Sequence, residues 1–163
     1  MSPTIRKYSM LFAVMTAAGL VPVAFAQGGP TVLSLAPLAA VTAKAGTAGQ
    51  STLSITVATG YHANSNKPAD SYLIPLTLIW NPGPLETVAI VFPKPQIQKL
   101  GFSAKPVSVF TGNFDIVTKF KIAGDAAPGK VAVQGKLHYQ ACDDRSCLPP
   151  KTIEVSLPLE IVK

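Results

Sequence analysis

The strongest constraint on the fold is a period of two in the placement of apolar residues. From residue 52 to 57 polar and apolar side chains alternate, and the alternation recurs over 114–122, 131–139 and 153–159. Successive side chains of a β-strand point to opposite faces, so each segment predicts a strand with one buried face. No segment sustains the 3.6-residue spacing of an amphipathic helix. The chain is therefore predicted to be built from strands.

Two apolar runs and a set of turn signals complete this prediction. Residues 72–80 and 85–92 are further strand candidates, and a first strand is expected near Val41. Pro75 favours an edge or bulged strand, because proline has no backbone donor for a sheet. Turn-forming residues separate the strands at 81–84, 112–113, 124–125 and 128–129. About seven or eight short strands with frequent turns predict an all-β sandwich.

The N-terminus has the three regions of a secretory signal peptide. The basic residues Arg6 and Lys7 precede an almost uncharged apolar stretch at 10–23, and Ala24-Phe25-Ala26 follows as a small-x-small cleavage pattern. We expect cleavage after Ala26 and a periplasmic or secreted product. No later apolar run approaches the roughly 18 residues that a membrane span needs.

The rest of the chain is expected to hold one domain. Residues 27–40 predict a linker or flexible arm, and residues 41–163 predict the domain itself. Loss of residues 1–26 lowers the formal net charge from +6 to +4. The remaining positive charge is dispersed, and Arg145 is the single arginine after the signal peptide. Arginine usually makes the bidentate contacts to phosphates and bases, so we expect no nucleic-acid partner.

Two cysteines carry the chemistry that the residues offer. Cys142 and Cys147 lie in the segment between the last two predicted strands and should pair in an oxidising compartment. The chain-entropy model assigns so short a loop only about 2 kcal/mol of stabilisation. Arg145 would favour a thiolate, whereas Asp143 and Asp144 oppose it. An inert bridge in a binding or structural module and a redox-active pair both stay open.

A metal site is a third interpretation. Cys142, Cys147, His62 and His138 could supply four ligands, but their spacing matches no common zinc pattern. All three methionines leave with the signal peptide, which removes the thioether ligands of many copper(I) sites. No serine-hydrolase, zinc-protease or phosphate-loop motif is present in the sequence. We therefore expect neither a metal nor a cofactor.

Two segments form a double motif. Residues 60–75 begin Gly-Tyr-His-Ala-Asn, and residues 139–150 contain both cysteines and end in Leu-Pro-Pro. Together they resemble the N-terminal periplasmic domain family of the bacterial thiol:disulfide interchange protein DsbD. The resemblance runs from about residue 41 to the end of the chain. It implies an immunoglobulin-like antiparallel β-sandwich that carries a redox-active cysteine pair.

The resemblance also implies a role for each cysteine. Cys142 and Cys147 would cycle between dithiol and disulfide, as a thiol-disulfide oxidoreductase component acting on protein disulfides. Cys147 would form the mixed disulfide with a partner, and Cys142 would resolve it. The implied partners are periplasmic thioredoxin-like proteins, disulfide isomerases and cytochrome c maturation proteins. As a free-standing, monomeric copy, the domain would take electrons from a separate membrane donor.

The family has a cap loop whose aromatic residue covers the disulfide. By resemblance, residues 106–112 occupy the place of this loop and Phe110 is the cap candidate, with ordinary core packing as its alternative. Four further residues are expected to line the site: Tyr61, His62, Asn64 and Tyr139. The cap segment is uncharged here, whereas the best-known members have an acidic cap and one more residue between the cysteines.

Overall fold

A computed structural model describes residues 31–163 of the chain, so the predicted signal peptide lies outside the described residues. This part contains twelve strands and no helix, and thus no helix that could cross a membrane. The strands, in chain order, are β1 (Leu33–Leu35), β2 (Val41–Lys44), β3 (Ala48–Val57), β4 (His62–Asn64), β5 (Thr77–Trp80), β6 (Leu85–Val91), β7 (Gln96–Gln98), β8 (Val107–Phe110), β9 (Asn113–Ile122), β10 (Gly129–Tyr139), β11 (Ala141–Cys142) and β12 (Lys151–Val162).

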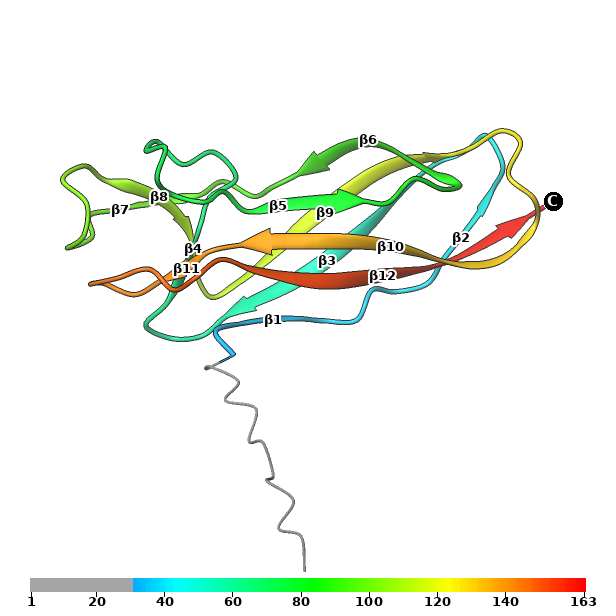
Figure 1. Cartoon of the computed structure of the whole chain (residues 1–163). Coiled ribbons are helices and arrows are strands. Elements are labelled where there is room, and N and C mark those ends of the chain that lie inside the picture. The colour runs from blue at the N-terminus through cyan, green and yellow to red at the C-terminus, as the bar shows by residue number, and fades with distance from the viewer. Residues whose placement is uncertain (1–30) are drawn as a thin grey trace, which may run out of the picture.

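Two four-stranded sheets form a sandwich (Figure 1), with the strand orders β1-β3-β9-β6 and β2-β12-β10-β5. Neighbouring strands are antiparallel except β2, which runs parallel to β12. The alternation predicted for β3, β9, β10 and β12 is confirmed over most of each strand, where alternate side chains enter one shared core. Val131, near the start of β10, is the exception, because it is 38% exposed. A hydrogen bond of 3.0 Å from Trp80 Nε1 to Thr118 Oγ1 joins the two sheets inside that core.

A third sheet, in the order β11-β4-β8-β7, gathers at the end of the sandwich opposite the C-terminus (Figure 1). Its strands are two to four residues long. Strand β4 belongs to the first segment of the double motif, and β11 contains Cys142. This small sheet positions the candidate site. Its strands are too short for a period of two to be visible in the sequence.

The segment expected to be a linker is partly a strand. Residues 33–35 form β1, which pairs with residues 55–57 of β3, and Val32 and Leu33 are each only 2% exposed. The chain then crosses to the other sheet, where β2 pairs with β12. The Ala-, Leu- and Pro-rich composition hid this strand because three residues are too few to establish an alternation.

The run at 72–80 also differs from its prediction. Only residues 77–80 form a strand, and they pair with β10 from Gly135 to His138. Leu73 and Leu76 are buried although they lie outside any strand. The dense apolar run at 72–80 therefore combines buried loop residues with a short strand. The prediction that the strand runs through Pro75 is wrong.

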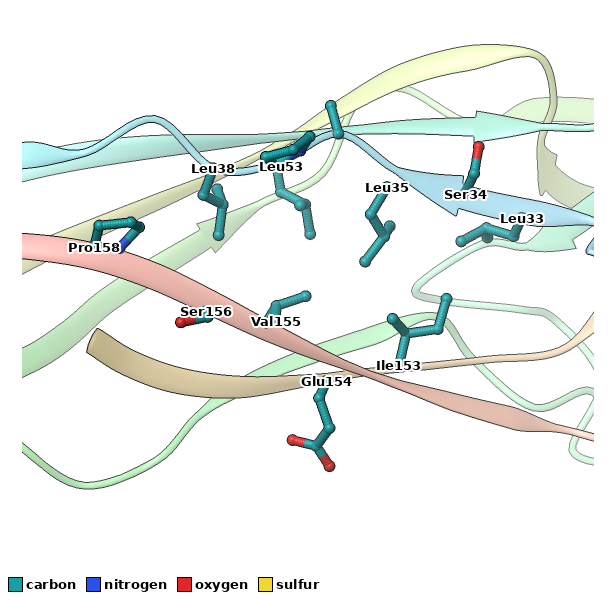
Figure 2. A pocket seen from close by; sticks show the side chains of 12 residues that line it. Leu33, Ser34, Leu35, Leu38, Leu53, Ile153, Glu154, Val155, Ser156 and Pro158 are labelled. Atoms are coloured by element: carbon teal, nitrogen blue, oxygen red, sulfur yellow. The ribbon is translucent and has the colours of Figure 1, made fainter.

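The largest of the described cavities lies far from the cysteines. It has a volume of about 620 Å³ and opens between β1, the crossover after it, and β12. Figure 2 shows Leu35 and Leu38 on one side and Ile153 and Val155 on the other, with Glu154 turned away. The cavity marks the seam where the chain passes from one sheet to the other.

Candidate functional site

Cys142 and Cys147 are joined by a disulfide with an S–S distance of 2.02 Å and a Cα–Cα distance of 3.9 Å. The two residues face each other as an antiparallel bridge, and the Leu148 amide donates to the Ala141 carbonyl at 2.8 Å. The pair thus closes the neck of a small loop. Cys142 is fully buried at 0% exposure, whereas Cys147 is partly exposed. Cys147 is therefore the more accessible residue of the pair.

The four residues between the cysteines are organised by Asp143. Its Oδ1 accepts hydrogen bonds from the backbone amides of Arg145, at 2.8 Å, and Ser146, at 2.7 Å. These amides, that of Arg145 first, hold the pKa of the Asp143 carboxyl below its usual range. The Asp143 amide also donates to the Ser146 carbonyl at 2.9 Å. The loop is closed by its own backbone and one ionised side chain.

Strand pairing sorts the side chains of the third sheet onto two faces. Ala141 pairs with Ala63, which pairs with Phe110, and all three belong to the main core of the sandwich. Cys142 pairs with His62, and each of them is adjacent in the chain to one residue of the Ala141–Ala63 pair. Successive side chains of a strand alternate between faces, so Cys142 and His62 lie on the opposite face. Asn64 shares that face, since it follows His62 by two residues. The pleat therefore separates the cysteine side from the core side.

Phe110 occupies the core side. It is 3% exposed and stacks on Phe114 and Phe92, with ring centroids 4.8 Å and 6.4 Å away. The structure thus places it in core packing, the alternative that the sequence left open. Tyr61 and Tyr139 also pack with the main core, and burial raises the pKa of the Tyr139 hydroxyl.

Phe102, which sequence reasoning missed, is an aromatic residue that packs against the same apolar cluster as Cys147. This second apolar cluster is formed by Leu73, Leu100, Val107 and Val109. The Phe102 ring also stacks on His62 with centroids 6.0 Å apart. Next to it, the Gly101 amide donates to the Asp144 carbonyl at 3.2 Å. The connection between β7 and β8 thus lies on the cysteine loop, and no sequence pattern marked this irregular segment.

His62 lies between Phe102 and the cysteine strand. It is 3% exposed, and its Nε2 has no hydrogen-bond partner among residues 31–163. Burial lowers the pKa of the imidazole below its usual value, while Asp144 and Asp143 act in the opposite direction. A cavity of about 390 Å³ next to the loop is lined by His62, Tyr61, Gln98 and Asp144 among others. His62 is therefore a neutral, unpaired ring beside the disulfide.

Asn64 and Gln140 form a buried amide network below the pair. Asn64 Nδ2 donates to the Ile74 carbonyl and to Gln140 Oε1, at 3.1 Å each. Gln140 Nε2 donates to the Leu148 carbonyl at 3.2 Å, directly after Cys147. Cys142 Sγ lies 3.9 Å from Asn64 Oδ1. Gln140 was not singled out from the sequence, because its partner Asn64 is 76 positions away.

His138 stands apart from this site. It lies on β10, and its Nδ1 is 2.9 Å from Thr152 Oγ1 of β12, on the outer side of the sheet. Within residues 31–163 no group of three or more His, Cys, Asp or Glu side chains is placed to hold a metal ion. The chemistry that this arrangement offers is exchange at the Cys142–Cys147 bond.

Comparison with known proteins gives one family match and several similar folds. The family model described as "Thiol:disulfide interchange protein DsbD, N-terminal" matches residues 30–159. The N-terminal periplasmic domain of ScsB from Proteus mirabilis is similar in fold, with a TM-score of 0.53 and 11% sequence identity. That match covers 77% of this chain and 44% of the other, so this chain spans less than half of its length.

A second similar structure is the reduced N-terminal domain of DsbD from Neisseria meningitidis. Its TM-score is 0.48 at 18% identity, and the match covers 76% of this chain and 83% of that one. No curated protein matches this sequence.

Proposed function

Because this chain belongs to the DsbD N-terminal domain family, we propose that it is an exported relay that passes electrons between proteins through the Cys142–Cys147 pair. The observation that carries this proposal is the unequal exposure of the two cysteines. Cys142 is sealed at 0% exposure and Cys147 is partly exposed, at one end of a rigid immunoglobulin-like β-sandwich. Reactive cysteines are partially exposed, because exchange requires a sulfur that the partner can reach.

The exchange proceeds by two substitutions at sulfur. The Cys147 thiolate attacks one sulfur of a partner disulfide, which forms a mixed disulfide and releases the other partner sulfur as a thiolate. Cys142 then loses its proton and attacks Cys147 Sγ. The mixed disulfide breaks, and the second partner sulfur leaves as a thiolate. Two electrons have passed to the partner, and the Cys142–Cys147 bond is restored. The reverse sequence accepts electrons.

The surroundings support these steps. The Asp143 turn and the Leu148–Ala141 hydrogen bond hold both cysteine backbones together without help from the disulfide. Phe102, stacked on His62 and packed near Cys147, is the proposed cap in place of Phe110. In this proposal the Phe102 ring limits access to the pair, and the partly exposed Cys147 is the residue that a partner meets first.

We propose periplasmic thioredoxin-like proteins or disulfide isomerases as partners, with a membrane-embedded electron donor. DsbD N-terminal domains are periplasmic, which agrees with an exported chain. We further propose that residues 1–26 are a signal peptide, which is removed by cleavage after Ala26.

Two single-cysteine variants test the relay. Cys142→Ala leaves Cys147 without its resolving thiol, so it should accumulate a mixed disulfide with a periplasmic protein, visible on a non-reducing gel. Cys147→Ala should trap none, and the double variant controls for adventitious bands. If Cys142→Ala traps no partner, the relay proposal fails.

The reduction potential separates the relay from an inert bridge. Structural disulfides of secreted proteins typically lie below about −300 mV. Proteins that exchange disulfides lie between about −270 and −120 mV, and the relay should have a value in this range. Equilibration of the purified domain with glutathione measures it, and a value at the structural end would indicate an inert module.

A further inference from the structure

The orientation of the Asn64 amide is determined by its partners. A backbone carbonyl only accepts hydrogen bonds, so the atom 3.1 Å from the Ile74 carbonyl is the amide nitrogen. Gln140 Oε1 accepts from the Ile74 amide at 3.2 Å, and from Asn64 Nδ2 at 3.1 Å. Both amide hydrogens of Asn64 are thereby used. Its oxygen, Oδ1, must face Cys142 Sγ, 3.9 Å away.

The disulfide state leaves this oxygen without a donor. A disulfide sulfur carries no hydrogen, so the approach of Cys142 Sγ to Oδ1 is only a contact while the bond is intact. Asn64 is 0% exposed, and a buried acceptor that lacks a donor is unfavourable. His62, two residues before Asn64 on the same face, has the same defect at its unpartnered Nε2. Within residues 31–163, Asn64 Oδ1 and His62 Nε2, both on the face that carries Cys142, are therefore unsatisfied in the oxidised protein.

We propose that Asn64 is a positioning residue that stabilises the reduced state, because its Oδ1 accepts a hydrogen bond from the Cys142 thiol once the disulfide is opened. This inference rests on the proposed function, since it concerns the same cysteine pair. Reduction by a dithiol or by glutathione adds two electrons and two protons, breaks the S–S bond and forms two S–H bonds. One of these S–H groups fills the vacant position at Oδ1.

The consequence is a division of roles between the cysteines. An acceptor that bonds to the S–H group favours the protonated form, so Cys142 stays a buried thiol. Cys147 has no such acceptor among the described residues and is left as the thiolate that attacks. A thiol held next to Asn64 is also in place to resolve the mixed disulfide when its proton departs.

The test measures the equilibrium of the pair with glutathione, in the full mature chain. Asn64→Leu has a similar volume and no acceptor, so it should shift the equilibrium about tenfold toward the disulfide, which is about 30 mV for a two-electron couple. Gln140→Met is the matched control. It removes the same amide network but leaves Asn64 Oδ1, still oriented by Ile74, and should shift the equilibrium less than about twofold.

Urea unfolding of both redox states shows whether the effect is specific. Asn64→Leu should lower the free energy of unfolding of the reduced form more than that of the oxidised form. A general packing defect would lower the free energy of unfolding of both forms by the same amount. If Asn64→Leu does not fold, Asn64→Ala is measured against the same criterion. A shift below about twofold in the Asn64 variant, or an equal shift in Gln140→Met, overturns the inference. Because glutathione replaces the protein partner, failure of the trapping experiment leaves this result unaffected.

Discussion

At the scale of single residues, the site depends on which face of a short sheet each side chain occupies. A shift of one position separates Phe110, which stacks on Phe114 in the core, from the face that carries Cys142 and His62. Phe102 lies in a loop, where no strand period applies, and packs against the same apolar cluster as Cys147. Aromatic residues that look equivalent in the sequence therefore have different roles.

The two phenylalanines give a paired prediction. Phe102→Ala should uncover the disulfide and raise its rate of reduction by dithiothreitol severalfold, with little loss of stability. Phe110→Ala should instead lower the free energy of unfolding by about 3–5 kcal/mol, because it leaves a cavity in the core. Stopped-flow reduction kinetics and urea titrations measure both. Faster reduction in a folded Phe110→Ala, with none in Phe102→Ala, would return the cap role to Phe110.

His62 predicts a pH dependence of stability. Its pKa is lowered in the folded protein, so the unfolded chain takes up the proton first as pH falls below about 6.5. The stability is fully present above that pH and is lost progressively below it, by at most about 1.4 kcal/mol per pH unit. Urea titrations of the oxidised protein at pH 7.5 and 5.5 should show the loss.

The same urea titrations of two variants show whether His62 causes the loss of stability at low pH. His62→Gln should remove most of the dependence on pH, and His138→Gln, which changes a histidine on the outer face of β10, should keep it. An unchanged loss in His62→Gln would show that other groups titrate instead.

At the scale of elements, close packing between β10 and its neighbours requires one glycine. A Cβ on Gly135 would lie 2.8 Å from Trp80 Cε3 and 2.9 Å from the backbone oxygen of Ile79. The backbone oxygen belongs to the paired strand β5 and cannot move away easily. The glycine lets β5 and β12 pack on β10 from both sides.

We therefore expect Gly135→Ala to lower the free energy of unfolding by about 1–3 kcal/mol through overpacking. Gly124→Ala is the matched control, because a Cβ there meets nothing within 4 Å. Thermal or urea unfolding monitored by Trp80 fluorescence measures both. Equal stability of the two variants would contradict this account of the β5–β10 contact.

At the scale of the whole molecule, the sandwich does not depend on the disulfide. The main core joins both sheets, whereas Cys142 lies in the third sheet at the end of the molecule (Figure 1), and Cys147 faces it as an isolated bridge. A bridge over so short a loop contributes about 2 kcal/mol in the chain-entropy model. The scaffold can thus hold the pair in either redox state.

Reduction should accordingly leave the domain folded, with a free energy of unfolding lower by about 2 kcal/mol or less. Urea titrations with and without dithiothreitol, followed by circular dichroism, measure the difference. Stabilisation of the dithiol by Asn64 would make the loss smaller. Global unfolding on reduction would be incompatible with a relay that works through both states.

The sequence by itself determined the long strands and the location of the chemistry. Alternation over about nine or ten residues signals a strand strongly, because each buried side chain adds to the same pattern. The double motif around residues 60–75 and 139–150 identified the cysteine pair and the family, which the match over residues 30–159 confirms. These features are local, and they can be recognised without knowing what packs against them.

Only the tertiary structure decided what surrounds the pair. Strand β1, the placement of Phe102 and the contact of Asn64 with Gln140 and Cys142 join segments far apart in the chain. Strands of two to four residues carry no readable period, and a loop has none. Their positions follow from the requirement that buried apolar surface be covered and buried amides be paired, which is met only when the whole chain is folded.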